Sequence, residues 1–245
     1  MQLTLQTKIF ADGAEKAGII ELHNNPLISG FTTNPTLMKK AGIKDYKAFA
    51  QDILKIIDDK PMSFEVFSDD FDEMEKQAIE IAKWGSNVIV KIPITNTKSE
   101  SSVDLVHKLS SKGIKLNVTA MMTVEQVVSV LPALSHGPNG YVSIFAGRIA
   151  DAGVDPVPIM KEILNILKDY PAIELIWASP RELFNIVLAN QIGCLIINVT
   201  NDILKKLPTL GKDLTEFSLD TVKMFYNDAS AAGYTIKYAS EKVLL

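Results

Sequence analysis

The sequence predicts an α/β fold, a single parallel (β/α)8 barrel of the TIM type with a C-terminal helix, and three observations support this prediction. Eight short segments rich in β-branched residues alternate with segments whose apolar residues recur at helical spacing. Several of the short segments are apolar on both faces, which is typical of parallel strands covered by helices. Finally, eight such pairs of strand and helix occupy about 200 residues, a size that suits a closed barrel.

The eight predicted strands are bounded by turn residues and contain few charges. In chain order they are QTKIFA (6–11), LISGFT (27–32), MSFEVF (62–67), NVIVKIPI (87–94), IKLNVTA (114–120), YVSIFAG (141–147), IELIWA (173–178) and CLIINVT (194–200). The same alternation of strands and helices also fits an open doubly wound sheet, which is the alternative arrangement.

Helices are predicted between these strands, because apolar residues follow each other at intervals of three and four in segments such as 46–57 and 74–81. A last helix is predicted from Asp213 to about Gly233. No segment rich in glycine, serine or charge divides the chain, so we expect one domain over residues 1–245.

Two helix starts have a more specific pattern. Thr123 with Gln126 and Ser179 with Glu182 have the spacing of a capping box, in which the two residues satisfy each other's backbone N–H groups. Pro180 suits a first helical position, where its missing N–H group costs nothing. We therefore expect helices to begin directly after Thr123 and Ser179.

Composition excludes several classes of function. The chain has 25 Lys and Arg against 29 Asp and Glu, a net charge of −4, which argues against binding to a nucleic-acid backbone. Its one cysteine, Cys194, cannot form an intramolecular disulfide and indicates a reducing compartment, so we expect a cytoplasmic protein. No uninterrupted apolar stretch has the length of a signal-peptide core or a spanning helix, and we expect no membrane partner.

Neither a metal nor a cofactor is expected. Acidic residues cluster at 69–75, but acids in a first helical turn complement the helix dipole, and a hard cation needs convergent oxygen ligands. The three histidines, His23, His107 and His136, fall in helical or loop segments away from strand ends. No glycine-rich nucleotide-binding loop occurs.

Polar residues at the carboxyl ends of the strands are the candidates for chemistry, because the βα loops of a barrel build its active face. The candidates from the first seven strands are Asp12, Thr33, Asn34, Glu65, Lys91, Asn117, Thr119, Ser143, Arg148 and Arg181. If the barrel closes, all of them converge on one face.

Lys91 is the most informative of these residues. It lies between Val90 and Ile92 in an apolar strand, so its amine points into the barrel or is desolvated outside it. Burial favours a neutral amine, which can attack a carbonyl and form a Schiff base. The alternative is a structural lysine paired with a buried carboxylate.

The carboxylates and arginines have similar alternatives. Asp12 and Glu65, at the ends of early strands, could supply acid–base catalysis or simply initiate turns and salt bridges. Arg148 and Arg181 suit a phosphate, because guanidinium groups donate two hydrogen bonds in a fixed fork, but they could also form surface ion pairs.

Four segments of the chain resemble the transaldolase family, and the resemblance extends over nearly the whole chain. GFTTNPTL (30–37) resembles the first transaldolase motif, and VIVKIPIT (88–95) resembles the strand that carries the Schiff-base lysine. NVTAMMTVEQ (117–126) and YVSIFAGRIAD (141–151) resemble the fifth and sixth strands. The short chain is similar to the compact branch, which also contains fructose-6-phosphate aldolases.

The resemblance implies a role for each candidate and adds new ones. Lys91 would be the Schiff-base nucleophile, Asp12 the base for the sugar's C4 hydroxyl, and Glu65 with Thr119 would hold the catalytic water. Substrate would be bound by Thr33, Asn34, Asn117, Ser143, Phe145, Arg148, Ser179 and Arg181, the two arginines taking the phosphate. The partners it implies are sugar phosphates and further copies of the chain in a homo-oligomer.

The first strand can be aligned in two registers. LTLQT would put Gln6 where the family carries its acid, whereas KIFADGA carries the apolar-Asp-small pattern at the family's distance from TTNP. We therefore expect Asp12 to be the acid.

Two positions favour a transaldolase over an aldolase that releases free dihydroxyacetone. Glu65 stands where aldolases tend to carry Gln, and Phe145 where they tend to carry Tyr. A phenyl ring lacks the hydroxyl that could hold water beside the enamine, so transfer should exceed release. Departures at Ile144, Trp177 and Pro180 leave an unusual sugar open, and a non-catalytic sugar-phosphate-binding barrel is the remaining alternative.

Overall fold

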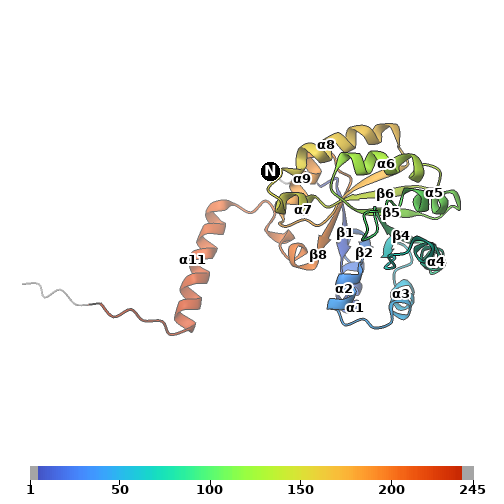
Figure 1. Ribbon diagram of the computed structural model, residues 1–245. Coiled ribbons are helices and arrows are strands. Elements are labelled where there is room, and N and C mark those ends of the chain that lie inside the picture. The colour runs from blue at the N-terminus through green and yellow to red at the C-terminus, as the bar shows by residue number, and fades with distance from the viewer. Residues whose placement is uncertain (1–4, 239–245) are drawn as a thin grey trace, which may run out of the picture. The chain divides into compact units, whose positions relative to one another are not determined.

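A closed barrel of eight parallel strands is the architecture of the computed structural model, which describes residues 5–238 (Figure 1). Each strand pairs with its sequence neighbours, and β1 pairs with β8 to close the ring. The predicted (β/α)8 fold is confirmed, and the open-sheet alternative is wrong. The strands are β1 Lys8–Asp12, β2 Ile28–Thr32, β3 Met62–Glu65, β4 Val88–Pro93, β5 Leu116–Met121, β6 Gly140–Ile144, β7 Ile173–Trp177 and β8 Ile196–Thr200.

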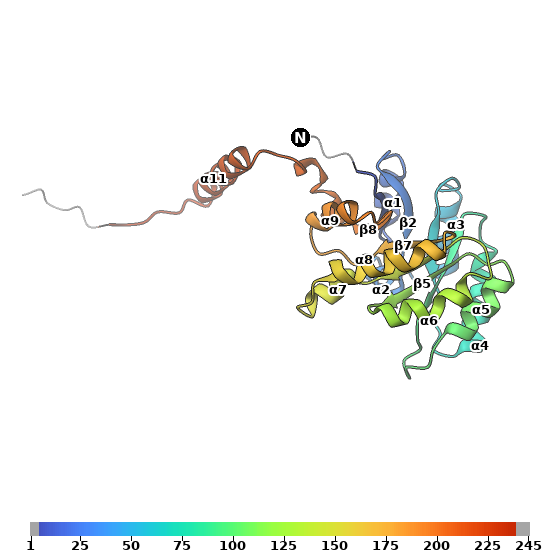
Figure 2. The ribbon, with the colours of Figure 1, turned by 90° about the horizontal axis from the view of Figure 1, so that it is seen from above.

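Helices surround the strands, as the view from above shows (Figure 2). The helices that belong to the barrel are α1 Lys16–His23, α2 Pro35–Lys40, α3 Tyr46–Leu54, α4 Phe71–Ala82, α5 Val103–Ser111, α6 Val124–Leu134, α7 Ala146–Asp151, α8 Pro156–Ile166, α9 Phe184–Ile192 and α10 Asn201–Leu204. Their buried apolar residues, such as Met74, Ala78 and Ile81 of α4, pack against outward-facing strand residues in the main core.

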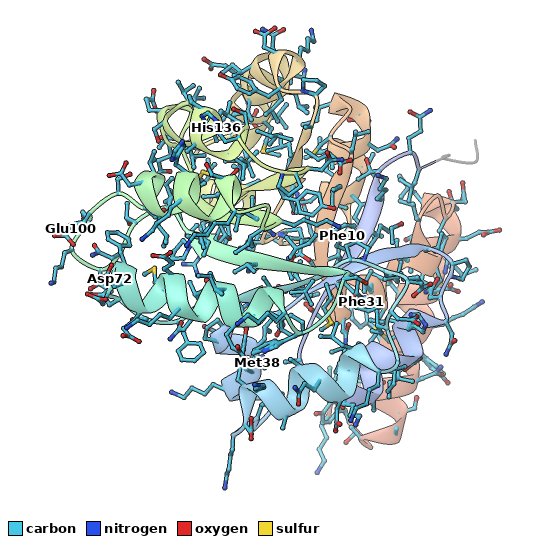
Figure 3. The ribbon with its side chains drawn as sticks, turned by 90° about the vertical axis from the view of Figure 1, so that its right-hand side faces the viewer. Phe10, Phe31, Met38, Asp72, Glu100 and His136 are labelled. Atoms are coloured by element: carbon cyan, nitrogen blue, oxygen red, sulfur yellow. The ribbon has the colours of Figure 1, made fainter. Side chains whose placement is uncertain are left out.

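A smaller apolar cluster fills the lower interior of the barrel. Phe10, Ile176 and Ile196 belong to it, with Tyr141 packed against them. Phe10 and Phe31 lie among the strands in Figure 3. A Cβ atom at Gly30 would lie 2.7 Å from the Phe10 ring, so glycine makes room for this ring inside the barrel.

Strand alternation makes the upper interior polar. Residues two apart on a strand face the same side, so Asp12 lies above Phe10 and Asn198 lies above Ile196. Apolar packing thus closes the lower end of the barrel, and polar side chains gather at the carboxyl ends of the strands.

One of the two predicted capping boxes is present. Thr123 Oγ1 accepts from the N–H of Gln126, and Gln126 Oε1 accepts from the N–H of Thr123, at the start of α6. The expectation for this helix is confirmed.

The other predicted helix start is wrong. α9 begins at Phe184, not after Ser179, and Ser179 has a left-handed φ of 59°. The side chain of Asn185 accepts from the N–H groups of Arg181 and Glu182, so these N–H groups are satisfied by a loop instead of a capping box.

The described residues fall into two compact units, 5–207 and 208–238. The second unit contains the predicted last helix, α11 Leu214–Ala231, where Asp213 accepts from the N–H groups of Thr215 and Glu216. Within residues 5–238, no helix is both long and apolar enough to cross a membrane. The single-domain organisation stays a prediction.

Candidate active site

A pocket of about 700 Å³ opens at the carboxyl ends of the strands. Its lining contains eleven of the twelve candidates, which therefore converge as expected. They are Asp12, Asn34, Glu65, Lys91, Asn117, Thr119, Ser143, Phe145, Arg148, Ser179 and Arg181. The alignment that places Asp12 at the end of β1 is consistent with this geometry, since Gln6 precedes the strand.

Lys91 and Glu65 form a buried ion pair on the pocket wall. Nζ of Lys91 lies 3.0 Å from Oε2 of Glu65, and the two side chains are 7% and 18% exposed. Nζ also donates to the carbonyl oxygen of Thr33 at 3.4 Å. The register of β3 and β4 places Glu65 directly beside Lys91, so the sheet itself sets the pair.

Asp12 is held by neighbours on both adjacent strands. Oγ1 of Thr32, on β2, lies 2.6 Å from Oδ1 of Asp12 and 2.6 Å from Oδ1 of Asn198, on β8. A hydroxyl has one proton, so it cannot donate fully to both oxygens. An amide oxygen only accepts, so Thr32 donates either to Asn198 or to Asp12 at any one time.

The pKa of Asp12 depends on its burial and on these neighbours. Burial raises the pKa of Asp12 above its ordinary value of 3.8, while the charge of Lys91 and hydrogen bonds from Thr32 and Asn198 act to lower it. A raised pKa makes the ionised carboxylate a stronger base.

Asn117 and Thr119 supply polar atoms from β5. Ser143 Oγ donates to Oδ1 of Asn117 at 2.7 Å, which turns Nδ2 of Asn117 away from this bond. Nδ2 of Asn117 and Oγ1 of Thr119 are buried without a hydrogen-bond partner among residues 5–238. Buried polar atoms are normally paired, so these two atoms are suited to bind a substrate or a water molecule.

The two arginines lie at the exposed rim of the pocket. Arg181 donates through Nε and Nη2 to Asp151 and through Nη1 to Oγ of Ser179. These bonds hold the pKa of Asp151 below its ordinary value. The guanidinium carbon of Arg148 lies 5.7 Å from the centre of the Phe145 ring, a cation–π contact. Both cations are therefore oriented by fixed neighbours.

Close backbone packing brings the segments of the two arginines together. A Cβ atom at Gly147 would lie 1.6 Å from the carbonyl oxygen of Ser179, so only glycine permits this approach. The left-handed φ of Ser179 turns the chain at the same point. Arg148 and Arg181 each follow this contact within one or two residues.

Thr33 and Asn34 were both predicted to bind substrate, but only Asn34 lines the pocket. The side chain of Thr33 is fully buried and does not line the pocket; its carbonyl oxygen contacts Lys91 instead. Asn34 does line the pocket, but its Oδ1 accepts from the N–H of Leu37 and caps α2. Nδ2 of Asn34 is the atom that remains for a substrate.

β8 contributes pocket residues that were not predicted from the sequence. Asn198, Thr200 and Asp202 line the pocket, and Thr32 joins Asn198 in holding Asp12. An asparagine in the apolar run CLIINVT is the signal that could have revealed this, by the same reasoning that selected Lys91.

The acidic run at 69–75 is engaged in local contacts. Asp70 caps α4, Asp69 accepts from the N–H and Oγ1 of Thr97, and Glu75 pairs with Lys108 and Lys112. Asp72, in the first turn of α4, is labelled at the edge of the view in Figure 3. No group of three or more His, Cys, Asp or Glu side chains within the described residues could hold a metal ion.

Comparison with known proteins agrees with this geometry. Residues 9–243 match the family model described as transaldolase/fructose-6-phosphate aldolase. A probable transaldolase of Dehalococcoides mccartyi is 36% identical over 217 residues, 87% of this chain and 97% of the relative. A probable transaldolase of Streptococcus agalactiae is 35% identical over 215 residues, 87% and 94% of the two chains.

Solved structures with little sequence identity to this chain also have a similar fold. An orotidine 5'-monophosphate decarboxylase from Metallosphaera sedula superposes with a TM-score of 0.51 over 89% of this chain and 97% of its own, at 12% identity. At that identity the likeness shows the barrel fold alone. The family match and the two relatives, in contrast, cover most of the chain, and they show that it belongs to the transaldolase/fructose-6-phosphate aldolase family.

Proposed function

We propose that the protein is a transaldolase that moves a three-carbon dihydroxyacetone unit between sugar phosphates through a Schiff base on Lys91. The observation that carries this proposal is the buried amine of Lys91, 3.0 Å from Glu65 in a pocket that also contains Asp12. A ketose phosphate such as fructose 6-phosphate or sedoheptulose 7-phosphate is the donor. An aldose phosphate such as erythrose 4-phosphate or glyceraldehyde 3-phosphate is the acceptor.

Glu65 accepts and returns a proton during Schiff-base formation. It takes a proton from the ammonium group of Lys91, and the free amine then attacks C2 of the ketose to give a carbinolamine. The protonated carboxyl group returns its proton to the departing hydroxyl, directly or through a water molecule held by Oγ1 of Thr119. Water leaves, and a protonated imine joins C2 to Nζ.

Asp12 acts on the carbon–carbon bond. As a carboxylate it takes the proton of the C4 hydroxyl, the bond between C3 and C4 breaks, and its electrons neutralise the imine nitrogen to give an enamine. The aldose phosphate leaves. When an acceptor aldehyde arrives, C3 of the enamine attacks its carbonyl carbon, and Asp12 returns the proton to the new hydroxyl. Hydrolysis then frees the product ketose from Lys91.

The remaining candidates bind the substrate in this scheme. Nδ2 of Asn34 and Nδ2 of Asn117 are donors for sugar hydroxyls, and Oγ of Ser143, which gives its proton to Asn117, accepts from one. Arg148 and Arg181 bind the phosphate at the rim, with Ser179 orienting Arg181. Thr33 contributes its carbonyl oxygen to the placement of Lys91 and no side-chain contact.

Phe145 favours transfer over release. It lines the pocket and packs against the smaller apolar cluster inside the barrel, so an apolar surface faces the site of the enamine. Release of dihydroxyacetone requires a proton on C3 of the enamine and then attack of water on the resulting imine, and a phenyl ring gives such a water no hydrogen bond.

The test compares turnover of fructose 6-phosphate with and without erythrose 4-phosphate. We expect turnover to fall at least tenfold without the acceptor, and Phe145→Tyr to raise the acceptor-independent release of dihydroxyacetone. Leu37→Met, on α2 at the pocket edge, is a control that adds no hydroxyl. Turnover that is undiminished without an acceptor would show an aldolase instead.

The same resemblance supports further proposals about the setting of the protein. We propose that it acts in the cytoplasm, in reactions of the pentose phosphate type, and that it assembles as a homo-oligomer. The single, buried cysteine agrees with a reducing compartment.

A further inference from the structure

A tyrosine outside the pocket lining makes direct contact with the main chain of Glu65. Oη of Tyr46 accepts from the N–H of Glu65 at 2.9 Å and donates to the carbonyl oxygen of Glu65 at 3.0 Å. Tyr46 is the first residue of α3, so a helix on the outside of the barrel bonds to the end of a barrel strand. Neither composition nor motif singles out this residue.

The ladder between β2 and β3 explains why Glu65 needs this partner. The N–H of Phe31 donates to the carbonyl oxygen of Pro61, and the N–H of Thr33 donates to that of Ser63. Two residues further, the donor for the carbonyl oxygen of Glu65 would be residue 35, which is a proline and has no N–H group. The turn into α2 therefore leaves the carbonyl oxygen of Glu65 without a hydrogen-bond donor from β2.

The hydrogen bond from the N–H of Glu65 to Tyr46 also leaves the carbonyl oxygen of Thr33 available to Lys91. In the regular ladder of parallel strands, the N–H of Glu65 would donate to the carbonyl oxygen of Thr33. It donates to Tyr46 instead, and the carbonyl oxygen of Thr33 accepts from Nζ of Lys91 at 3.4 Å. One phenol thus affects both members of the ion pair.

The ring of Tyr46 is held firmly enough to fix its hydroxyl. It contacts the rings of Phe64, Phe67 and Trp84 at centroid distances of 6.1, 5.5 and 5.7 Å. Burial also raises the pKa of Tyr46, so the phenol keeps its proton and can donate and accept at once. A rigid neutral phenol is well suited to replace a strand.

We propose that Tyr46 is a positioning residue for the pair of Glu65 and Lys91. Its hydroxyl takes the place of β2 at the end of β3, and it sets where the Glu65 carboxylate meets Nζ of Lys91. The catalytic consequence rests on the proposed function of Glu65, whereas the positional consequence does not. Tyr46 touches no reacting atom in this scheme and acts only through the main chain of Glu65.

The test replaces the hydroxyl and keeps the ring, with Tyr46→Phe. Tyr141→Phe is the matched control, because Tyr141 lies in the barrel among Phe10 and the lower apolar cluster. Thermal unfolding of each variant checks that it is folded. Amide hydrogen exchange at Glu65 and a crystal structure of each variant measure position, and single-turnover trapping of the Lys91 adduct measures chemistry.

In Tyr46→Phe we expect the Glu65 amide to exchange at least tenfold faster and the carboxylate to move from Nζ of Lys91. We expect the rate constant of adduct formation to fall about tenfold, because about tenfold is the effect of losing one hydrogen bond. KM should change less than about twofold. Tyr141→Phe should match the wild type in all of these measurements.

Two results would overturn the proposal. Either Glu65 keeps its exchange rate and its distance to Lys91 in Tyr46→Phe, or both move and the adduct forms at the wild-type rate. Absence of any adduct in the wild type would refute the proposed function, and the exchange and crystal measurements would still decide whether Tyr46 positions Glu65.

Discussion

At the scale of single residues, the raised pKa of Asp12 is the most consequential feature of the site. Burial raises this pKa above 3.8, although Lys91, Thr32 and Asn198 act to lower it. The folded protein therefore binds a proton at Asp12 more tightly than the unfolded chain does. By linkage, the stabilising contribution is complete below pH 3.8 and is lost as the pH rises through the folded-state pKa.

Asp12→Asn tests the direction of this pH dependence. The amide imitates the protonated acid, so the variant should be more stable than the wild type at neutral pH and nearly equal to it near pH 4. Denaturant unfolding of both proteins across this pH range measures the difference. The same variant should lose transfer activity, since an amide cannot take the C4 proton.

A difference in stability that does not change with pH would contradict the raised pKa of Asp12. Thr36→Val is a suitable control for packing at the same rim, because it removes a hydroxyl from the pocket lining without removing a titrating group.

Lys91 and Asn198 show how far single residues could be predicted. A lysine in an apolar strand is conspicuous, and its inward position follows from strand alternation. The contact of Thr32 with Asn198 could not be predicted, because it depends on closure of β1 between β2 and β8. The bond from Tyr46 to Glu65 also depends on how α3 packs outside β3, which no local pattern states.

At the scale of elements, the N-cap residue of α2 has a structural role and, in the proposed scheme, a binding role. Oδ1 of Asn34 caps the helix, and Nδ2 is left for the substrate. The two roles can be separated because aspartate also caps helices but offers no N–H donor.

Asn34→Ala and Asn34→Asp should therefore differ in stability and agree in activity. Loss of the cap in Asn34→Ala should lower the free energy of unfolding by about 1 kcal/mol, whereas Asn34→Asp should stay close to the wild type. Both variants should lower kcat/KM by about tenfold, the effect of one lost hydrogen bond. Denaturant unfolding and steady-state kinetics measure the two effects, and wild-type kinetics in Asn34→Asp would exclude the amide as a donor.

Element boundaries were predictable where periodicity or a complete capping box marks them. The strand segments and the start of α6 follow from local pattern. The start of α9 did not follow, because Ser179 is turned into a left-handed conformation by its packing against Gly147, a residue far along the chain.

At the scale of the whole molecule, the barrel has an apolar lower interior and a polar upper end. The candidates gather at the polar end from the first seven strands, and β8 adds Asn198 and Thr200. The fold class was predictable from alternation alone. Eight strand–helix pairs in about 200 residues favoured a closed barrel, and the structure excluded the open sheet, which has the same local pattern.

A homo-oligomer is the expectation at this scale. Within its own unit, α11 leaves Phe217, Val222 and Phe225 exposed, and exposed apolar residues at this density are typical of association surfaces. Size-exclusion chromatography with light scattering should give a multiple of the 26.9 kDa chain mass. A mass of one chain at micromolar concentration would contradict the expectation.

Borohydride trapping is the measurement that tests the central claim most directly. The protein is incubated with fructose 6-phosphate, reduced, digested and analysed by peptide mass spectrometry, with Lys91→Arg as the variant that keeps a cation and loses the nucleophile. The account predicts an increment of one dihydroxyacetone unit on Lys91 and none in the variant. An adduct on another lysine, or no adduct in folded protein with several ketose phosphates, would contradict it.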